Sequence, residues 1–287
     1  MAGLVDQSQI EQALRDVGLR PGAVVIVHSR LFSLGLVRGV NATADIAGVY
    51  RATFQEMLGS QGTLVVPTYT TTFGRYGRPF ALETSPSEMG AFSEHVRTSP
   101  GAMRTLHPVQ SLTALGAQAQ ALTANHPRWN VGYDTIWQRM YERNGQVIAV
   151  GIPFRQCLSF VHQVESLACV PYLYHKLLSG EVYVGGRRID NEFLLAVRYL
   201  KRGIAYDLAR LERDLRQHGL VTEVPLGTDR VQRISMDAIF DTCMDGLRKD
   251  SYYLLRSHPE FTRGEIPWDG PTNGREEPVP SYFQVLE

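Results

Sequence analysis

The segment Cys157 to Glu165 (C-L-S-F-V-H-Q-V-E) contains the clearest pair of groups that could do chemistry, His162 and Glu165. It follows Val147 to Gly151, an apolar run ending at a glycine that predicts a buried strand. Residues three apart share a helix face, so Glu165 can reach one ring nitrogen of His162. The carboxylate would fix the imidazole tautomer and leave the other nitrogen as a base at neutral pH. Alone, such a pair is also common on helix surfaces.

A second polar cluster, His28-Ser29-Arg30, follows the apolar run Ala23 to Val27. Ligands in α/β proteins bind at the carboxyl ends of buried strands. The next loop, Leu31 to Gly39, has two glycines that let a backbone approach a ligand closely. It is neither a P-loop nor a G-x-G-x-x-G turn, so a phosphate cradle and a plain strand-helix loop both remain open.

Further hydroxyl and basic groups follow the predicted strand Gly62 to Val66. Thr68 and Tyr69 come directly after it, and hydroxyls there can donate to ligand oxygens. Arg104 and His107 lie in a third cluster, Met103 to Ser111, and offer groups that pair with anions.

Composition narrows the classes of function. The chain has 287 residues, with 29 Lys plus Arg against 29 Asp plus Glu, so the basic excess of a nucleic-acid-binding protein is absent. Its 3 cysteines include no C-x-x-C pair, which argues against a disulfide framework or a zinc site, and no metal site is predicted. With no signal-peptide pattern and no apolar run of about 18 residues, we expect a cytoplasmic protein without a membrane span.

Alternating strands and helices predict an α/β fold with parallel crossovers. We expect a single domain over residues 1–287. Residues 1–170 form its cofactor and catalytic half, residues 171–260 supply substrate-side β/α elements, and the proline-rich residues 261–287 form an extended tail.

The motifs, in order, resemble those of the aminoglycoside 3-N-acetyltransferase family. They are His28-Ser29, G-T-L-V-V-P-T from Gly62, Met89-Gly90, M-R-T-L-H-P-x-x-S from Met103, and H-x-x-E from His162. Members of this family move an acetyl group from acetyl-coenzyme A to an amine of an amino sugar. The resemblance implies a three-layer α/β/α sandwich around a mixed, mostly parallel sheet, with additional C-terminal β/α elements.

The resemblance also implies site roles. His162 would be the general base, Glu165 its orienter, and Thr68 would lie near the thioester. The residues it places around coenzyme A are His28, Ser29, Arg30, Leu31, Ser33, Leu34, Gly35, Arg104, His107 and Ser111.

The substrate side departs from the family pattern. Arg30 replaces a second serine, the stretch from Gly132 to Ile136 lacks the family's proline, and only Ser159 keeps a hydroxyl before His162. We assign the substrate side to Tyr69, Asp134, Tyr172 and Tyr174.

The acceptor is a small-molecule amine, and several alternatives are open. Tyrosines and basic residues between Tyr172 and Arg188 favour a nucleotide-linked amino sugar, because aromatic rings stack on bases and cations pair with a diphosphate. A neutral chain suits a polycationic aminoglycoside less well, although an antibiotic-resistance enzyme is the second interpretation. A third interpretation is a non-catalytic ligand-binding relative. The acyl group could also be longer than acetyl, and Cys157 or Cys169 could form a covalent acyl-enzyme. A homodimer is possible as the oligomeric state.

Overall fold

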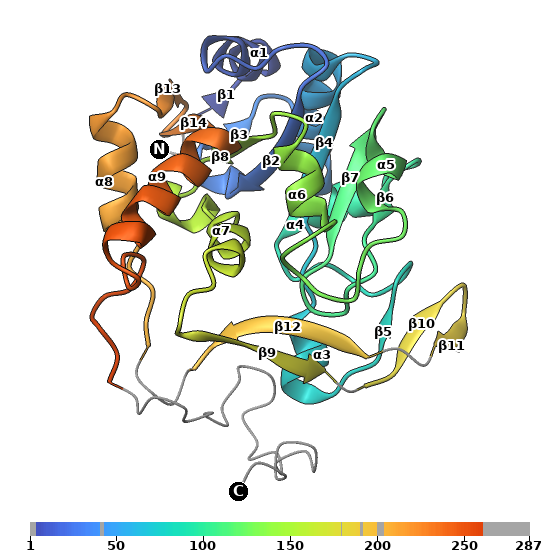
Figure 1. The fold of residues 1–287 in the computed structure, drawn as a ribbon. Coiled ribbons are helices and arrows are strands. Elements are labelled where there is room, and N and C mark those ends of the chain that lie inside the picture. Colours follow the sequence, from blue (N-terminus) through green and yellow to red (C-terminus); the bar gives the residue numbers. More distant parts are fainter. Residues whose placement is uncertain (1–3, 41–42, 179, 190–191, 200–203, 261–287) are drawn as a thin grey trace, which may run out of the picture.

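The computed structural model describes residues 4–40, 43–178, 180–189, 192–199 and 204–260 (Figure 1). The predicted tail, residues 261–287, lies outside the described residues. Within those ranges, no helix has both the length and the apolar character that crossing a membrane requires. The same ranges contain no group of three or more His, Cys, Asp or Glu side chains that could hold a metal ion.

A seven-stranded sheet forms the centre of the fold, in the order β13-β14-β8-β2-β4-β7-β6. The central strands are the β-branched, apolar runs expected to be buried. In chain order the strands are β2 Val24–Ser29, β4 Thr63–Pro67, β6 Met103–Arg104, β7 Leu112–Gly116, β8 Gln146–Val150, β13 Thr222–Leu226 and β14 Asp229–Ser235.

The sheet is mixed, as expected, but the prediction that it is mostly parallel is wrong. Only β2 pairs in parallel, with β4 on one side and β8 on the other. The pairs β4–β7, β7–β6, β8–β14 and β14–β13 are antiparallel. The β13–β14 hairpin can join only antiparallel neighbours, because a parallel pair needs a long crossover connection.

Helices pack against both faces of this sheet (Figure 1). Along β2, Val24 and Ile26 join one apolar cluster, whereas Val25 and Val27 join the other, as the alternation of a strand requires. The first cluster includes residues of α5 Ala119–Thr123, α6 Ile136–Tyr141, α7 Val161–Leu167, α8 Ala209–Gln217 and α9 Met236–Lys249. The second includes residues of α1 Gln7–Asp16, α2 Thr43–Leu58 and α4 Ala91–Arg97.

A separate group of strands lies below the main sheet in Figure 1 and forms the floor under α7. It has its own apolar cluster, which includes Phe73, Phe80 and Leu195. The antiparallel pair of β9 Leu173–Leu178 and β12 Phe193–Arg198 runs beneath α7, beside the short helix α3 Thr71–Tyr76. The remaining short elements are β1 Leu4–Val5, η1 Leu31–Ser33, β3 Leu36–Val37, β5 Phe80–Ala81, η2 Phe154–Cys157, β10 Val182–Val184 and β11 Arg187–Ile189.

Candidate active site

The helix that carries His162, α7, follows the central strand β8 and the short helix η2 in the chain. Gly151 ends that strand with a φ of 61°, and a Cβ there would lie 2.8 Å from the carbonyl oxygen of Arg30. The close approach explains the glycine and holds the loop after β2 against the chain that leads into α7. The hydroxyl of Ser33 adds a hydrogen bond to the Gly151 carbonyl.

His162 and Glu165 form the predicted pair. Nδ1 of His162 lies 2.8 Å from Oε2 of Glu165, and the Glu165 side chain is completely buried, with an exposed fraction of 0%. The helical spacing of three residues brings the two groups together.

Two tyrosine hydroxyls complete the hydrogen bonds of the Glu165 carboxylate. Tyr172 donates to Oε1 at 2.6 Å, and Tyr206 donates to Oε2 at 2.9 Å. Burial, and next the adjacent Glu165 charge, raise the pKa of both tyrosines, so both remain protonated donors. With these donors in place, the carboxylate is also the acceptor for Nδ1–H of His162. That tautomer leaves the lone pair of the imidazole on Nε2.

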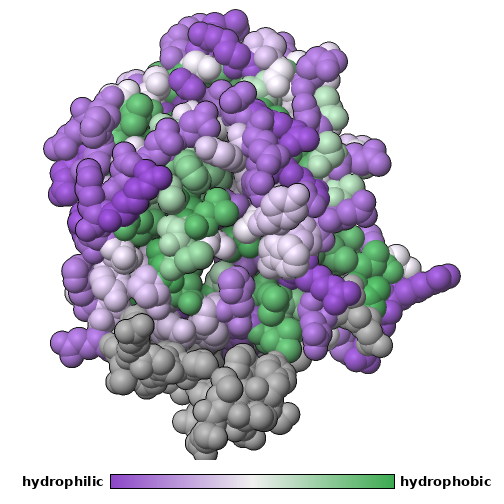
Figure 2. Space-filling view, in the orientation of Figure 1, coloured by the Kyte–Doolittle hydropathy of each residue, from purple (hydrophilic) through white to green (hydrophobic). Residues whose placement is uncertain are grey.

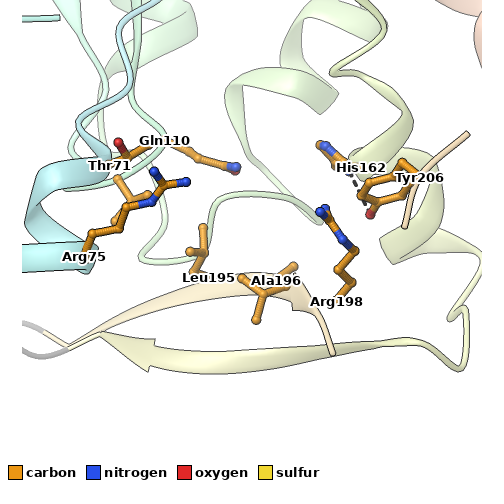
Figure 3. A pocket seen from close by; sticks show the side chains of 11 residues that line it. Thr71, Arg75, Gln110, His162, Leu195, Ala196, Arg198 and Tyr206 are labelled. Carbon is orange, nitrogen blue, oxygen red and sulfur yellow. Dashed lines mark hydrogen bonds between the residues drawn. The ribbon is translucent and has the colours of Figure 1, made fainter. Parts of the chain in front are cut away.

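His162 and Tyr206 border a pocket of about 270 Å³ (Figure 3). Figure 2 shows this face of the molecule hollowed below its centre, with apolar side chains around the opening. The imidazole is 34% exposed, so a bound molecule can reach Nε2. The lining residues are Thr71, Gly74, Arg75, Val109, Gln110, His162, Leu195, Ala196, Val197, Arg198 and Tyr206.

His107 connects two walls of this pocket. Its Nδ1 accepts from the backbone N–H of Gln110 at 3.0 Å, and its Nε2 donates to the Leu194 carbonyl at 3.2 Å. Burial lowers the pKa of His107 to about 3, so the ring is neutral and can accept on one nitrogen and donate from the other. His107 lines neither this pocket nor the second pocket described below, and its predicted place beside the cofactor stays a prediction.

Thr68 and Ser111 are buried and form a network with the half-buried Arg104. None of the three lines the His162 pocket or the second pocket described below, although Arg104 borders a different pocket. The Thr68 hydroxyl lies 3.1 Å from that of Thr113 and 3.2 Å from the Ser111 carbonyl. Arg104 donates to the Thr68 carbonyl at 2.6 Å and to the Ser111 hydroxyl at 2.9 Å. These bonds hold the Thr68 hydroxyl inside the protein, and its place at the thioester stays a prediction.

A second pocket, of about 250 Å³, lies beside the loop after β2. Of the residues predicted to hold the cofactor, Ser29, Arg30 and Leu31 line it. The next three residues of the loop, Ser33, Leu34 and Gly35, do not line it. The Ser33 hydroxyl donates to the Gly151 carbonyl, and Leu34 is buried in the core. The sequence analysis missed the other lining residues, Phe32, Ile46, Ala47, Met89, Gly90, Ala91 and Phe92, although the Met89-Gly90 pair was among the motifs.

His28 lies at the end of β2, but its side chain is buried and lines neither pocket. Burial lowers the pKa of His28 to about 4. Its Nε2 has no hydrogen-bond partner among the described residues.

None of the four residues assigned to the substrate lines the His162 pocket. The hydroxyl of Tyr69 bonds to Ser159, and burial raises its pKa to about 12. Asp134 forms an ion pair with Arg139 at 2.9 Å, and Tyr172 holds Glu165. The rings of Tyr174 and Tyr199 stack with centroids 4.8 Å apart. The structure instead brings Thr71, Arg75, Gln110, Arg198 and Tyr206 to the pocket, and of these only Gln110 lies within one of the sequence motifs.

The family model for aminoglycoside 3-N-acetyltransferases matches residues 26–248. The chain belongs to the aminoglycoside 3-N-acetyltransferase family. Two curated members, aminoglycoside N(3)-acetyltransferase IX of Micromonospora chalcea and VII of Streptomyces paromomycinus, are each 31% identical over 211 residues. Those matches cover 67% of this chain and 72% and 70% of the two relatives. The chain is therefore an N-acetyltransferase with acetyl-coenzyme A as its acyl donor.

Solved structures of other proteins share the fold of this acetyltransferase. The structure of AAC-IIIb with coenzyme A has a TM-score of 0.73 at 22% identity, over 86% of this chain and 97% of that one. The structure of AAC(3)-IVa with a bound gentamicin has a TM-score of 0.72 at 23% identity, over 90% of this chain and 93% of that one. These similarities support the mixed α/β fold.

Proposed function

We propose that this acetyltransferase acetylates the amine of an amino sugar bound in the His162 pocket, with His162 as the general base and Glu165 as its orienter. The hydrogen bonding of Glu165 carries this proposal. Two protonated tyrosines and Nδ1–H of His162 donate to one buried carboxylate, which leaves Nε2 as the proton acceptor facing the pocket. A non-catalytic relative would have no need to bury this charged group.

The proposed step uses this tautomer directly. Nε2 of His162 takes a proton from the amine as its nitrogen forms a bond to the thioester carbon. The carbon–sulfur bond then breaks, and the proton passes from His162 to the departing thiolate. General-base catalysis of this kind is worth about 10²–10⁴-fold in rate.

The second pocket suits coenzyme A in its chemistry. Leu31, Phe32 and Met89 offer apolar surface for the pantetheine chain, and Arg30 offers a cation for a phosphate. Ile46 and Ala47, one turn into α2, add further apolar surface. Of the other predicted cofactor residues, Ser33 and Leu34 belong to the same loop and would support the wall of this pocket from behind.

The packing of helices on both faces of the sheet supports a three-layer α/β/α arrangement within one domain. The β9–β12 pair under α7 supports the assignment of residues 171–260 to the substrate side. The homodimer and the cytoplasmic location remain predictions.

An aminoglycoside is the second candidate acceptor. It is favoured by the names of the curated relatives and by the AAC(3)-IVa structure with bound gentamicin. A nucleotide-linked sugar loses its original support, because Arg188 pairs with Glu181 at 3.3 Å and neither Arg187 nor Arg188 lines the pocket.

Thiol release from acetyl-coenzyme A tests the proposed function, with His162→Gln compared against wild type on a panel of amino sugars and aminoglycosides. We expect kcat to fall about 10²–10⁴-fold while the affinity for coenzyme A stays the same. His218→Gln is the matched control, since His218 is exposed and lies outside both pockets. Wild-type turnover by His162→Gln would show that His162 is not the general base.

A further inference from the structure

We propose that the acceptor carries an anionic group, a phosphate or a carboxylate, which Arg75 binds at one side of the His162 pocket, while Arg198 adds positive charge at the other side. This inference rests on the proposed function and names the class of amine that the site selects. It separates this chain from an enzyme that captures polycationic aminoglycosides.

Arg75 is a cation that faces the pocket without a partner. It lies in the last turn of α3, is exposed, and forms no hydrogen bond or ion pair with any described residue. Figure 3 shows its guanidinium directed into the pocket beside Gln110. A guanidinium offers five donors in a planar fork, which matches the oxygens of a phosphate or carboxylate.

Glu88, an acidic residue that contacts the start of α3, already has hydrogen-bond partners. Glu88 accepts hydrogen bonds from the backbone N–H groups of Thr71 at 2.9 Å and Thr72 at 3.1 Å, and from both hydroxyls. Partial burial opposes the shift, but these hydrogen bonds lower the pKa of Glu88 below its usual value. The carboxylate thus caps α3 and does not neutralise Arg75.

Arg198 supplies the second cation, on the His162 side of the pocket (Figure 3). Its guanidinium carbon lies 4.7 Å from the ring centroid of Tyr206, and its Nε donates to the Ile204 carbonyl at 2.9 Å. These contacts fix the arginine at the end of β12, close to the dyad.

The charge of the pocket is therefore positive in the part of the chain that the structure describes. Its lining contains two guanidinium groups and no carboxylate side chain. Glu165 lies behind His162, fully buried and occupied by three donors. A polycation would meet like charges here, whereas an anionic acceptor would form charge-assisted hydrogen bonds.

A matched series of acceptors tests the inference. The series is glucosamine, glucosamine 6-phosphate, the corresponding 6-carboxylate and kanamycin, each assayed by thiol release with the wild-type protein. We expect kcat/KM for at least one anionic sugar to exceed that for glucosamine by about 10-fold, since a charged hydrogen bond is the stronger kind. The two anionic sugars distinguish a phosphate from a carboxylate.

Substitution of Arg75 tests the residue itself. Arg75→Glu should abolish the preference for the anionic sugar, and Arg75→Lys should keep part of it. Arg78→Glu is the matched control, because Arg78 is exposed, follows α3 and lies outside the pocket lining. Calorimetry of the same sugars with His162→Gln gives their dissociation constants, and so measures the preference for an anionic sugar even where turnover is slow.

Two results would overturn the inference: tighter binding and faster turnover of glucosamine or kanamycin than of either anionic sugar, or a preference that Arg75→Glu leaves unchanged. If kanamycin is preferred and His162→Gln removes its turnover, the proposed function stands and only this inference fails. If His162→Gln acts like wild type, the proposed function itself fails.

Discussion

The hydroxyl of Tyr172 lies 2.6 Å from Oε1 of Glu165, so the carboxylate beside His162 is held through its other oxygen. Tyr206 binds the oxygen that His162 also contacts. His162 and Glu165 are therefore part of a four-residue network, in which His162, Tyr172 and Tyr206 all donate hydrogen bonds to the Glu165 carboxylate.

Glu165→Gln is expected to reduce kcat and destabilise the fold. The amide NH₂ must face either a tyrosine hydroxyl or Nδ1–H, so one buried donor loses its acceptor, at about 1–3 kcal/mol. His162 would also lose the carboxylate that fixes its tautomer. We expect kcat to fall less than in His162→Gln, with an unchanged KM for acetyl-coenzyme A, in thiol-release assays and thermal unfolding. Glu142→Gln, at an exposed position on the same face of the sheet, is the control. Wild-type kcat in Glu165→Gln would contradict the dyad.

Arg104→Ala is expected to lower stability more than donor binding. Arg104 donates to the Ser111 hydroxyl and to the carbonyls of Thr68 and Ser85, and burial lowers its pKa to about 10. Removing it deletes three charge-assisted hydrogen bonds, and we expect the free energy of unfolding to fall by about 2–4 kcal/mol. Urea unfolding of Arg104→Ala, with Arg78→Ala as control, measures this loss. A raised KM for acetyl-coenzyme A at unchanged stability would restore the original prediction of a cofactor contact.

The sequence predicted the features that depend on local spacing. The His162–Glu165 pair follows from a helical repeat, and the buried strands Val24–Ser29 and Thr63–Pro67 follow from unbroken apolar runs. The first strand led to three of the residues that line the second pocket. Each of these predictions needed only neighbours along the chain.

The missed features depend on contacts between distant segments. Tyr206 is 44 residues from His162. Arg75 and Arg198 line the same pocket only because α3 and β12 form opposite parts of it. The sequence also did not predict which way a side chain points after the end of a strand. Thr68 was expected to face a ligand, but its hydroxyl turns into the sheet toward Thr113. The antiparallel strands likewise follow from tertiary pairing and not from strand propensity.

Acid is expected to destabilise the protein through buried histidines. Burial lowers the pKa of His28 to about 4 and that of His107 to about 3, whereas an unfolded histidine has a pKa near 6.5. The unfolded state therefore binds more protons below pH 6.5, so stability is present above that pH and is lost as the pH falls toward 4. Each histidine contributes a slope of about 1.4 kcal/mol per pH unit.

Urea unfolding between pH 7 and pH 5 measures this slope. His28→Leu should reduce it by about 1.4 kcal/mol per pH unit, because leucine fills a similar volume and cannot bind a proton. His218→Gln should leave it unchanged, since His218 is exposed. A flat stability curve between pH 6.5 and pH 5 would contradict the burial of neutral histidines.

Loss of Cys157 and Cys169, which flank His162 and Glu165 in the sequence, is expected to leave catalysis intact. Burial raises the pKa of the Cys157 thiol, which disfavours the nucleophilic thiolate, and Cys169 lies outside both pockets. The variant Cys157→Ala with Cys169→Ala should keep kcat, at a cost in stability of about 1–2 kcal/mol for the cavity at Cys157. Mass spectrometry of wild-type protein, quenched during turnover, should find no acetylated cysteine. An acetyl group on either residue that then passes to the amine would replace direct transfer by a covalent intermediate and reduce His162 to its activator.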